Sequence, residues 1–387
     1  MKKEEIILKK WFLIIMKKIN NHTILFFTVI AIVLFGTFLM YSASSSFAYY
    51  KFNKSDTYFL SKHFTWLFIG FSYLIILQFF NYKKLNQYSK IILFLSWIIM
   101  LIPIIMNIGE KSIDRWLRIG NFTLLTTSDA AKLGIIIFTA SFIDKYHQQI
   151  NNTETLLKHL LPYIAISIGL IAYQPDLSTT ILISVIFFSL LYIAGLNRQN
   201  ILSFFGLGIT VLLFLLYRFP YQLKRLLSWV GVGEVNGQSS NSVLALANGG
   251  IIGKGIGDSA FKYNGFIPEG QTDFILAIIG EELGFLGVLI IFLLFIILLF
   301  QGLSISKNCS DRFSMFLSLG LTINIFLYLI INSAYVVGIL PTTGLPIPFI
   351  SYGGSQTIFS LISIGLLISI SKSSYSNINP KYYYDRS

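Results

Sequence analysis

Long apolar segments separated by shorter polar ones make up most of the chain. Ten of them approach or reach the length needed to cross a membrane core about 30 Å thick, at about 1.5 Å of helical rise per residue. They are Thr23–Ala43, Phe64–Phe80, Ile91–Met106, Ser128–Ile143, Leu160–Tyr173, Leu177–Gly195, Ile201–Tyr217, Phe274–Phe300, Phe313–Leu340 and Phe349–Ile370. The pattern predicts an all-α polytopic membrane protein with about ten transmembrane helices and both termini on one side.

The composition supports this class. The chain has 387 residues, of which 55% are hydrophobic and 12% charged, whereas a soluble protein carries about 25% charged residues. The single cysteine, Cys309, excludes an internal disulfide. The apolar run Trp11–Met16 is too short for the core of a cleavable signal peptide, so we expect the first span to remain as an anchor.

The distribution of basic residues predicts the orientation in the membrane. With the N-terminus in the cytoplasm, 17 of the 29 Lys and Arg residues fall inside and 11 outside, and Lys132 lies within a span. Cytoplasmic loops carry an excess of Lys and Arg, so this orientation is favoured. We expect residues 1–22 to be a basic cytoplasmic tail, 23–370 the membrane domain and 371–387 a second cytoplasmic tail. Residues 218–272 would form one long exterior loop between helices 7 and 8.

The stretch from Pro268 to Gly287 passes from this long polar segment into an apolar span, and Asp273 lies at its mouth. One interpretation makes Asp273 a helix cap, because Asp accepts hydrogen bonds from first-turn amides. The other makes it a general base, since a carboxylate on a rigid helix at the membrane surface can reach a substrate held by the exterior loops.

Two more acids, Glu281 and Glu282, lie about 12–14 Å deeper along the same helix. Acids at such a depth must be paired, hydrogen-bonded or protonated. Lys132 is the one basic residue deep in another span, three residues after Asp129 on the same helix face. We therefore predict a polar cavity between the fourth and eighth spans, in which Lys132 faces one of the glutamates. A purely structural ion pair is the alternative.

The loop before the fourth span carries Arg115, Trp116 and Arg118. An indole at the interface is usually a membrane anchor. Beside two guanidinium groups it could also hold a sugar face next to a diphosphate, because Arg binds phosphate oxygens in a bidentate manner. The glycine-rich part of 218–272 lacks the ending of a Walker loop, and no cluster of His, Cys or acidic residues has metal-site spacing.

Five segments, in order along the chain, resemble motifs of the SEDS family of cell-wall proteins, which includes FtsW, RodA and SpoVE. The most specific are Phe266–Gly284, similar to the family's Pro-Glu-x-His-Thr-Asp-Phe-Ile-Phe-Ala and Gly-Glu-Glu-Leu-Gly, and Leu340–Ser355, which carries nearly the whole family signature. Shorter matches are Arg115–Gly120, Ala131–Leu133 and Gln174–Leu177. With the spans around them, the matches extend the resemblance from the first span to the tenth.

Some positions depart from the family pattern. Gln271 stands where the family usually has His, and Ser178 replaces a Gly. Thr126–Asp129 replaces the usual Gln-Pro-Ser-Glu, so the acid before Lys132 is one methylene shorter. The segment Tyr41–Ala48, after the first span, looks more like the cell-division branch of the family than the elongation branch.

The resemblance implies a peptidoglycan glycosyltransferase that polymerises lipid II at the outer face of the bacterial cytoplasmic membrane. It implies that Asp273 accepts the proton of the acceptor 4-hydroxyl, while that oxygen displaces undecaprenyl diphosphate from the donor with inversion. Cations would stabilise the leaving group, and a divalent cation such as Mg²⁺ or Mn²⁺ could assist; no other cofactor is expected. We expect the substrate-binding residues to be Arg115, Trp116, Arg118, Asp129, Lys132, Glu269 and Glu282.

Three functions remain open at this point: a lipid II polymerase, a lipid II flippase, and a non-catalytic scaffold for a transpeptidase. A polymerase needs its essential acid at the exterior mouth, at Asp273, whereas a flippase would depend on the charges in mid-membrane. The expected partners are a class B penicillin-binding protein transpeptidase and other divisome membrane proteins at the division septum. We expect no nucleic-acid partner.

Overall fold

The structure is a computed structural model of the 387-residue chain. It describes residues 21–52, 55–106, 116–119, 122–174, 176–231, 237–263, 266–267 and 270–378. The helices at the ten expected spans are α2 (Asn21–Phe52), α3 (Tyr58–Gln78), α5 (Ser89–Met106), α6 (Thr127–Tyr146), α8 (Leu161–Tyr173), α9 (Leu177–Ile193), α10 (Arg198–Arg218), α14 (Ile275–Lys307), α15 (Arg312–Val336) and α16 (Gly354–Ile378). The shorter elements are α4 (Lys83–Gln87), β1 (Trp116–Ile119), β2 (Phe122–Thr126), the 3₁₀ turn η1 (His147–Gln149), α7 (Thr153–His159), α11 (Pro220–Trp229), α12 (Gly237–Gly249) and α13 (Ala260–Tyr263).

The predicted class, an all-α polytopic membrane protein, is confirmed. Within the described residues, seven helices are long and apolar enough to cross a membrane, and the pair α7 and α8, bent by 47°, makes up to eight. The count of ten is not confirmed: α9 is apolar but shorter, and α6, which carries four charged residues, is not among the candidates. The last helix continues to Ile378, past the expected end of the span at Ile370.

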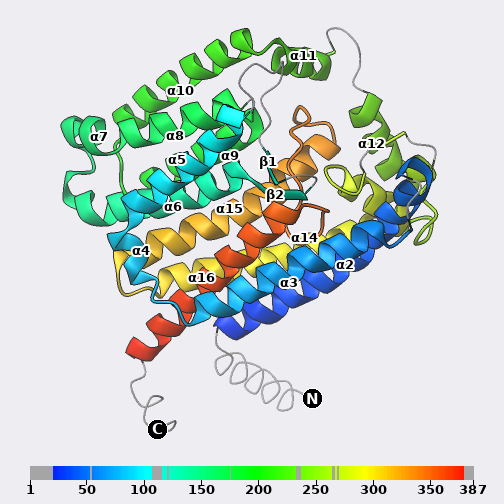
Figure 1. Cartoon of the computed structure of the whole chain (residues 1–387), viewed down its shortest axis with the longest axis horizontal. Coiled ribbons are helices and arrows are strands. Elements are labelled where there is room, and N and C mark those ends of the chain that lie inside the picture. The colour runs from blue at the N-terminus through cyan, green and yellow to red at the C-terminus, as the bar shows by residue number, and fades with distance from the viewer. Residues whose placement is uncertain are drawn as a thin grey trace, which may run out of the picture.

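The long helices α2, α3, α14, α15 and α16 lie side by side (Figure 1), with α16 packed along α3 and α14 packed on both α15 and α2. The sequence of α3 explains why one face of this helix packs against its neighbours. Its buried residues recur every three or four positions and form one stripe, whereas Phe68 on the other face is 76% exposed, as expected for a lipid-facing side chain. The stripe consists of Phe59, His63, Leu67, Gly70 and Leu74.

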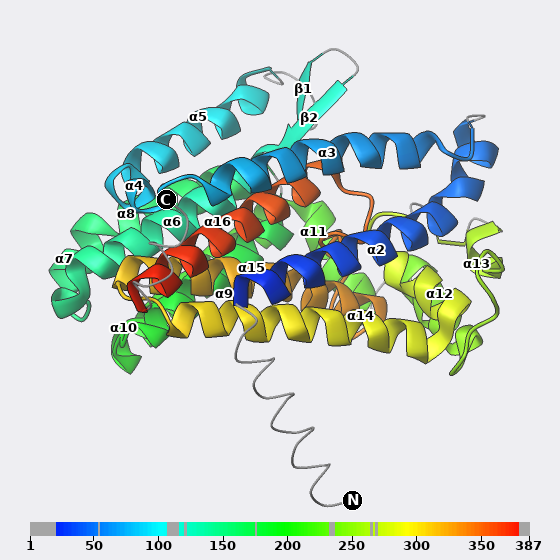
Figure 2. The same ribbon diagram turned by 90° about the horizontal axis from the view of Figure 1, so that it is seen from below.

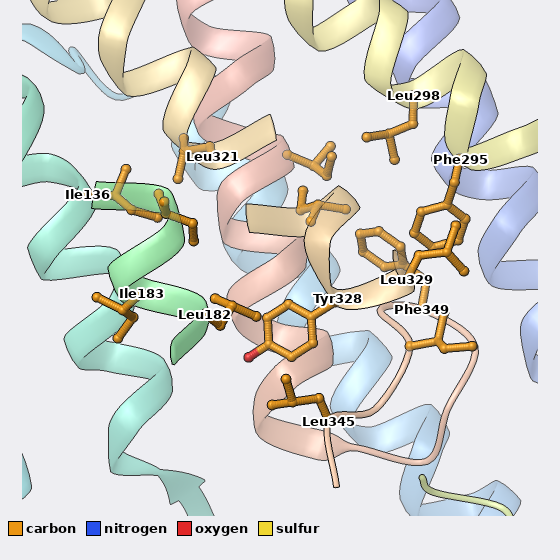
Figure 3. Packing of buried hydrophobic residues seen from close by; sticks show 14 of the residues in the cluster. Ile136, Leu182, Ile183, Phe295, Leu298, Leu321, Tyr328, Leu329, Leu345 and Phe349 are labelled. Atoms are coloured by element: carbon orange, nitrogen blue, oxygen red, sulfur yellow. The ribbon is translucent and has the colours of Figure 1, made fainter. Parts of the chain in front are cut away.

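The fourth expected span, α6, is buried on all sides because it packs against α5, α9 and α15. Figure 3 shows part of this core, where Ile136 of α6 lies near Ile183 of α9 and Leu321 of α15. The strands β1 and β2 pair antiparallel and lead directly into α6. In Figure 2, this hairpin and α5 lie on the opposite side of the molecule from α12 and α14.

The sequence predicts one long exterior loop over 218–272. The structure instead has three helices in this segment, α11, α12 and α13. Helix α12 packs along α14. Figures 1 and 2 both place α12 and α13 at the end of the bundle where α2 ends and α14 begins. The segment therefore folds back onto the membrane domain, and its glycine-rich part determines how closely it can approach α14.

Helix α14 is broken at Gly284, which has φ 68° and ψ −165°. Main-chain groups freed by a break inside a membrane must find partners within the protein. Here the glycine-rich segment supplies them, because Gly249 and Gly253 lie so close to α14 that a Cβ atom at either would overlap its main chain. The main-chain bonds are Lys254 N to Glu281 O at 3.0 Å, Gly255 N to Glu282 O at 3.0 Å, Phe285 N to Gly250 O at 2.9 Å and Leu286 N to Ile251 O at 3.1 Å.

Candidate functional site

Asp273 lies just before the first turn of α14, where the segment 218–272 joins the bundle. The N-cap residue of α14 is Phe274, which makes no side-chain capping bond, and both interpretations of Asp273 stay predictions. The Asp273 side chain is partly buried. Its main-chain carbonyl accepts hydrogen bonds from Asn332 Nδ2 at 2.8 Å and from Tyr335 Oη at 2.6 Å. Helix α15 therefore holds the start of α14.

The loop between α15 and α16 lies against the Asp273 carboxylate. Gly344 in this loop has a φ of 70°, and a Cβ atom added there would lie 3.3 Å from Asp273 Oδ2. Any other residue at this position would be strained and would crowd the carboxylate. The two segments that carry the most specific motifs, 266–284 and 340–355, thus meet at Asp273.

Other segments converge on the same region. Ser178 Oγ, in the first turn of α9, donates to Thr343 O at 2.6 Å. The starts of α6 and α9 are joined by a hydrogen bond from Ser128 Oγ to Asp176 Oδ2 at 2.9 Å. Trp229, the last residue of α11, contacts the same loop: its Nε1 donates to the carbonyl of Gly338 at 3.0 Å. These contacts bring the starts of α6 and α9, the end of α11 and the loop between α15 and α16 together at one end of the bundle.

Asp129 and Lys132 form an ion pair within α6, with Lys132 Nζ 2.6 Å from Asp129 Oδ1 and both side chains buried. Lys132 Nζ also lies 4.4 Å from the centre of the Tyr328 ring and 3.5 Å from Gln356 Oε1. A small cavity beside them is lined by Asn324 and by residues of α16. The polar cavity therefore exists, but it lies between α6, α15 and α16.

The predicted pairing of Lys132 with a glutamate of the eighth span is wrong. Glu282 is paired instead with Lys262, whose Nζ lies 2.8 Å from Glu282 Oε1, and it accepts a hydrogen bond from Ser42 Oγ of α2 at 2.6 Å. Glu281 accepts from Asn248 Nδ2 at 2.7 Å and from Ser259 Oγ. Both acids thus fasten the folded-back segment to α14, which satisfies them without Lys132.

The remaining expected substrate-binding residues are only partly placed. Arg115 and Glu269 lie outside the described residues. Trp116 begins β1 and is 40% exposed, and Arg118 lies opposite Thr123 in the same hairpin. Their roles stay predictions. Among the residues that the structure describes, no group of three or more His, Cys, Asp or Glu side chains is arranged to hold a metal ion, and no step below is assigned to one.

Several residues important to this geometry were missed in the sequence. Asn332 and Tyr335 lie in an apolar span, where a buried amide is itself a signal, because polar groups in a membrane helix need partners. Lys262 lies outside the apolar patch Val243–Ala247, which does indicate that part of this segment folds back, and the residues around Lys262 give no indication of a buried partner. Ser42 lies in the segment Tyr41–Ala48 that resembles the division branch, but that resemblance gives no indication of a partner in α14.

The fold and the site define a helical membrane protein in which a carboxylate at the mouth of the bundle is held by two converging segments. Residues 22–376 match the family model described as Cell cycle protein, which groups FtsW, RodA and SpoVE. The chain belongs to this family.

Individual relatives agree with this assignment. The chain is 32% identical over 363 residues to a probable peptidoglycan glycosyltransferase FtsW of Geobacter metallireducens, covering 92% of this chain and 96% of that protein. It is 30% identical over 366 residues to the stage V sporulation protein E of Bacillus subtilis, covering 92% and 98%.

Solved structures share the fold. A chain from a structure described as the structural coordination of polymerization and crosslinking by a peptidoglycan synthase complex superimposes with a TM-score of 0.70 at 22% identity, covering 91% of this chain and 97% of that one. The rod shape determining protein RodA of Thermus thermophilus gives a TM-score of 0.64 at 21% identity, covering 91% and 96%.

Proposed function

We propose that this protein is a peptidoglycan glycosyltransferase that polymerises lipid II into glycan strands at the outer face of the bacterial cytoplasmic membrane. The observation that carries the proposal is the position of Asp273. Its carboxylate lies at the mouth of the bundle, against the loop of Gly344, on a main chain fixed by two hydrogen bonds from α15. A base for a hydroxyl group needs this combination of access and rigidity.

In the proposed reaction Asp273 takes the proton from the 4-hydroxyl of the acceptor sugar. The oxygen then forms a bond to the anomeric carbon of the donor, the bond from that carbon to the diphosphate breaks, and undecaprenyl diphosphate leaves with the bonding electrons. One base on the acceptor side is sufficient for inversion. The leaving group becomes more negative in the transition state, so fixed positive charges near it would accelerate the step.

Arg115, Arg118 and Lys132 are proposed to supply that positive charge, with Trp116, Asp129 and Glu269 completing the substrate site. Lys132 is supported by its burial beside a polar cavity in the bundle. The pairing of Glu282 with Lys262 favours a structural role for Glu282, so its assignment to substrate is not maintained.

We propose a class B penicillin-binding protein transpeptidase as the partner, with other divisome membrane proteins, at the division septum. The fold shared with a chain of a peptidoglycan synthase complex supports a transpeptidase partner. Sequence similarity to proteins named FtsW supports the division role.

The activity can be tested with the purified protein and its transpeptidase in detergent, supplied with lipid II. We expect glycan strands that are degraded by a muramidase and that form when the transpeptidase active site is blocked. A flippase would instead move labelled lipid II across a vesicle without making strands, and a scaffold would do neither. Either result would contradict the polymerase.

The proposed orientation places both termini in the cytoplasm and Asp273 outside. A cysteine at Ser240, an exposed position in α12, is expected to react with a membrane-impermeant thiol reagent in intact cells, because it lies on the exterior segment. Cys309, between α14 and α15, should react only after permeabilisation, and a Ser240→Cys/Cys309→Ser variant isolates the first signal. Labelling of Cys309 in intact cells would reverse the orientation.

A further inference from the structure

A buried amide links the two segments that meet at Asp273. Asn332, in α15, is completely buried. Its Nδ2 lies 2.8 Å from the main-chain oxygen of Asp273 and 2.7 Å from that of Leu345. Leu345 follows Gly344, the residue whose main chain lies against the Asp273 carboxylate. One side-chain amide thus contacts both the residue that carries the candidate base and the loop that faces it.

Chemistry determines the orientation of this amide. Main-chain carbonyl oxygens can only accept, so Asn332 Nδ2, not Oδ1, must face Asp273 and Leu345. The same nitrogen lies 2.6 Å from Tyr335 Oη, so its two N–H groups are shared among three acceptors, and within the described residues Oδ1 has no hydrogen-bond partner. Tyr335, one turn further along α15, donates its hydroxyl to the same Asp273 oxygen at 2.6 Å. Its ring also packs edge-on against Phe274, with 5.5 Å between ring centres. The main chain at the start of α14 is therefore held by two donors and a ring contact.

We propose that Asn332 and Tyr335 are positioning residues for Asp273: they set the distance between its carboxylate and the loop of Gly344 that faces it. This inference rests on the proposed function. Neither side chain needs to touch the substrate, because both act through the main chain that carries the base. A shift of about 1 Å at a reacting group can reduce a rate about 100-fold, so loss of these bonds is expected to lower turnover more than affinity.

The competing explanation is that the two residues only fasten α15 to its neighbours. In that case their removal would lower the melting temperature and the amount of folded protein, and whatever folded would have normal kinetics. Tyr335→Phe separates the two explanations because it deletes only the hydroxyl and keeps the ring packed against Phe274. Tyr82→Phe is a matched control, because Tyr82 is also buried and its hydroxyl donates to Ser373 at 3.4 Å, at the other end of the bundle.

In the lipid II polymerisation assay, Tyr335→Phe is expected to lower kcat about tenfold, which corresponds to about 1.4 kcal/mol of transition-state stabilisation, with KM unchanged. Asn332→Ala, which removes the contacts to Asp273, Leu345 and Tyr335, is expected to lower kcat about 100-fold. Tyr82→Phe should keep the wild-type kcat. A Tyr335→Phe enzyme with wild-type kcat would overturn the proposal.

A second measurement does not depend on activity. A water-soluble carbodiimide and an amine label accessible carboxylates, and mass spectrometry can compare Asp273 with the exposed Asp258 in the same molecule. We expect Tyr335→Phe to raise the labelling rate of Asp273 relative to Asp258 and Tyr82→Phe to leave it unchanged. An unchanged labelling ratio in Tyr335→Phe would overturn the positioning role. Failure of the wild-type protein to make glycan strands would instead contradict the proposed function, and the labelling experiment could still be read.

Discussion

Asp273→Asn is expected to abolish glycan-strand synthesis while leaving membrane insertion, lipid II binding and association with the transpeptidase intact. Asn has nearly the same shape as Asp and can form similar hydrogen bonds, but it cannot accept the proton of the acceptor hydroxyl. A positioned general base contributes about 10²–10⁴-fold to a rate, so the loss should fall in that range. The measurement is the initial rate of strand formation from lipid II by the purified complex.

Two further variants make this result specific. Asp273→Glu keeps a carboxylate but displaces it by one methylene, so a small residual rate is expected. Asp258→Asn changes an exposed acid of the glycine-rich segment and should behave like the wild type. If Asp273 served only to stabilise the helix start, Asp273→Asn would be nearly silent, because Asn is as good a capping residue as Asp. A normal rate for that variant would return Asp273 to a structural role.

The helical membrane architecture was predictable because lipid imposes a simple requirement: apolar segments of a certain length become helices that satisfy their own main chain. That requirement located helices at all ten expected positions. It did not predict that α6 would be enclosed by α5, α9 and α15, since a buried span and a lipid-facing one can have similar composition. Nor did it predict the helix in 218–272 that packs along α14, because α12 contains polar residues and is too short to span.

The candidate site was only partly predictable for a related reason. Topology brings together loops on one side of a membrane, and the loop of Gly344 and Asp273 lie on the same side in the predicted orientation. Side-chain partners depend on distances that topology does not give. Lys132 was assigned to the glutamates because it was the one basic residue deep in another span, but Lys262 reaches Glu282 from a segment that looked exterior. Residues of a polar segment can complete a buried site wherever glycines let the chain fold back.

The pairing of Lys262 with Glu282 leads to the largest stability effect that we expect. Their side chains are only 3% and 1% exposed, so removing the lysine leaves an uncompensated carboxylate in the protein interior. Breaking a buried ion pair in this way costs about 3–5 kcal/mol. Lys262→Met keeps a long apolar side chain and removes only the charge and its hydrogen bonds. We expect a clearly lower melting temperature in detergent and less folded protein in the membrane.

The double variant Lys262→Met/Glu282→Gln provides the decisive comparison. It removes both charges, and Ser42 Oγ, which donates to Glu282 at 2.6 Å, can still donate to the new amide oxygen. Stability should therefore recover toward the wild type, so that the effects of the two substitutions are far from additive. Lys254→Met, at an exposed lysine of the same segment, controls for the loss of positive charge and should have a normal melting temperature. The contrary result is a double variant that is no more stable than Lys262→Met alone. It would show that the ion pair does not hold the folded-back segment on α14. The main-chain hydrogen bonds around Gly284 would then be sufficient for that contact.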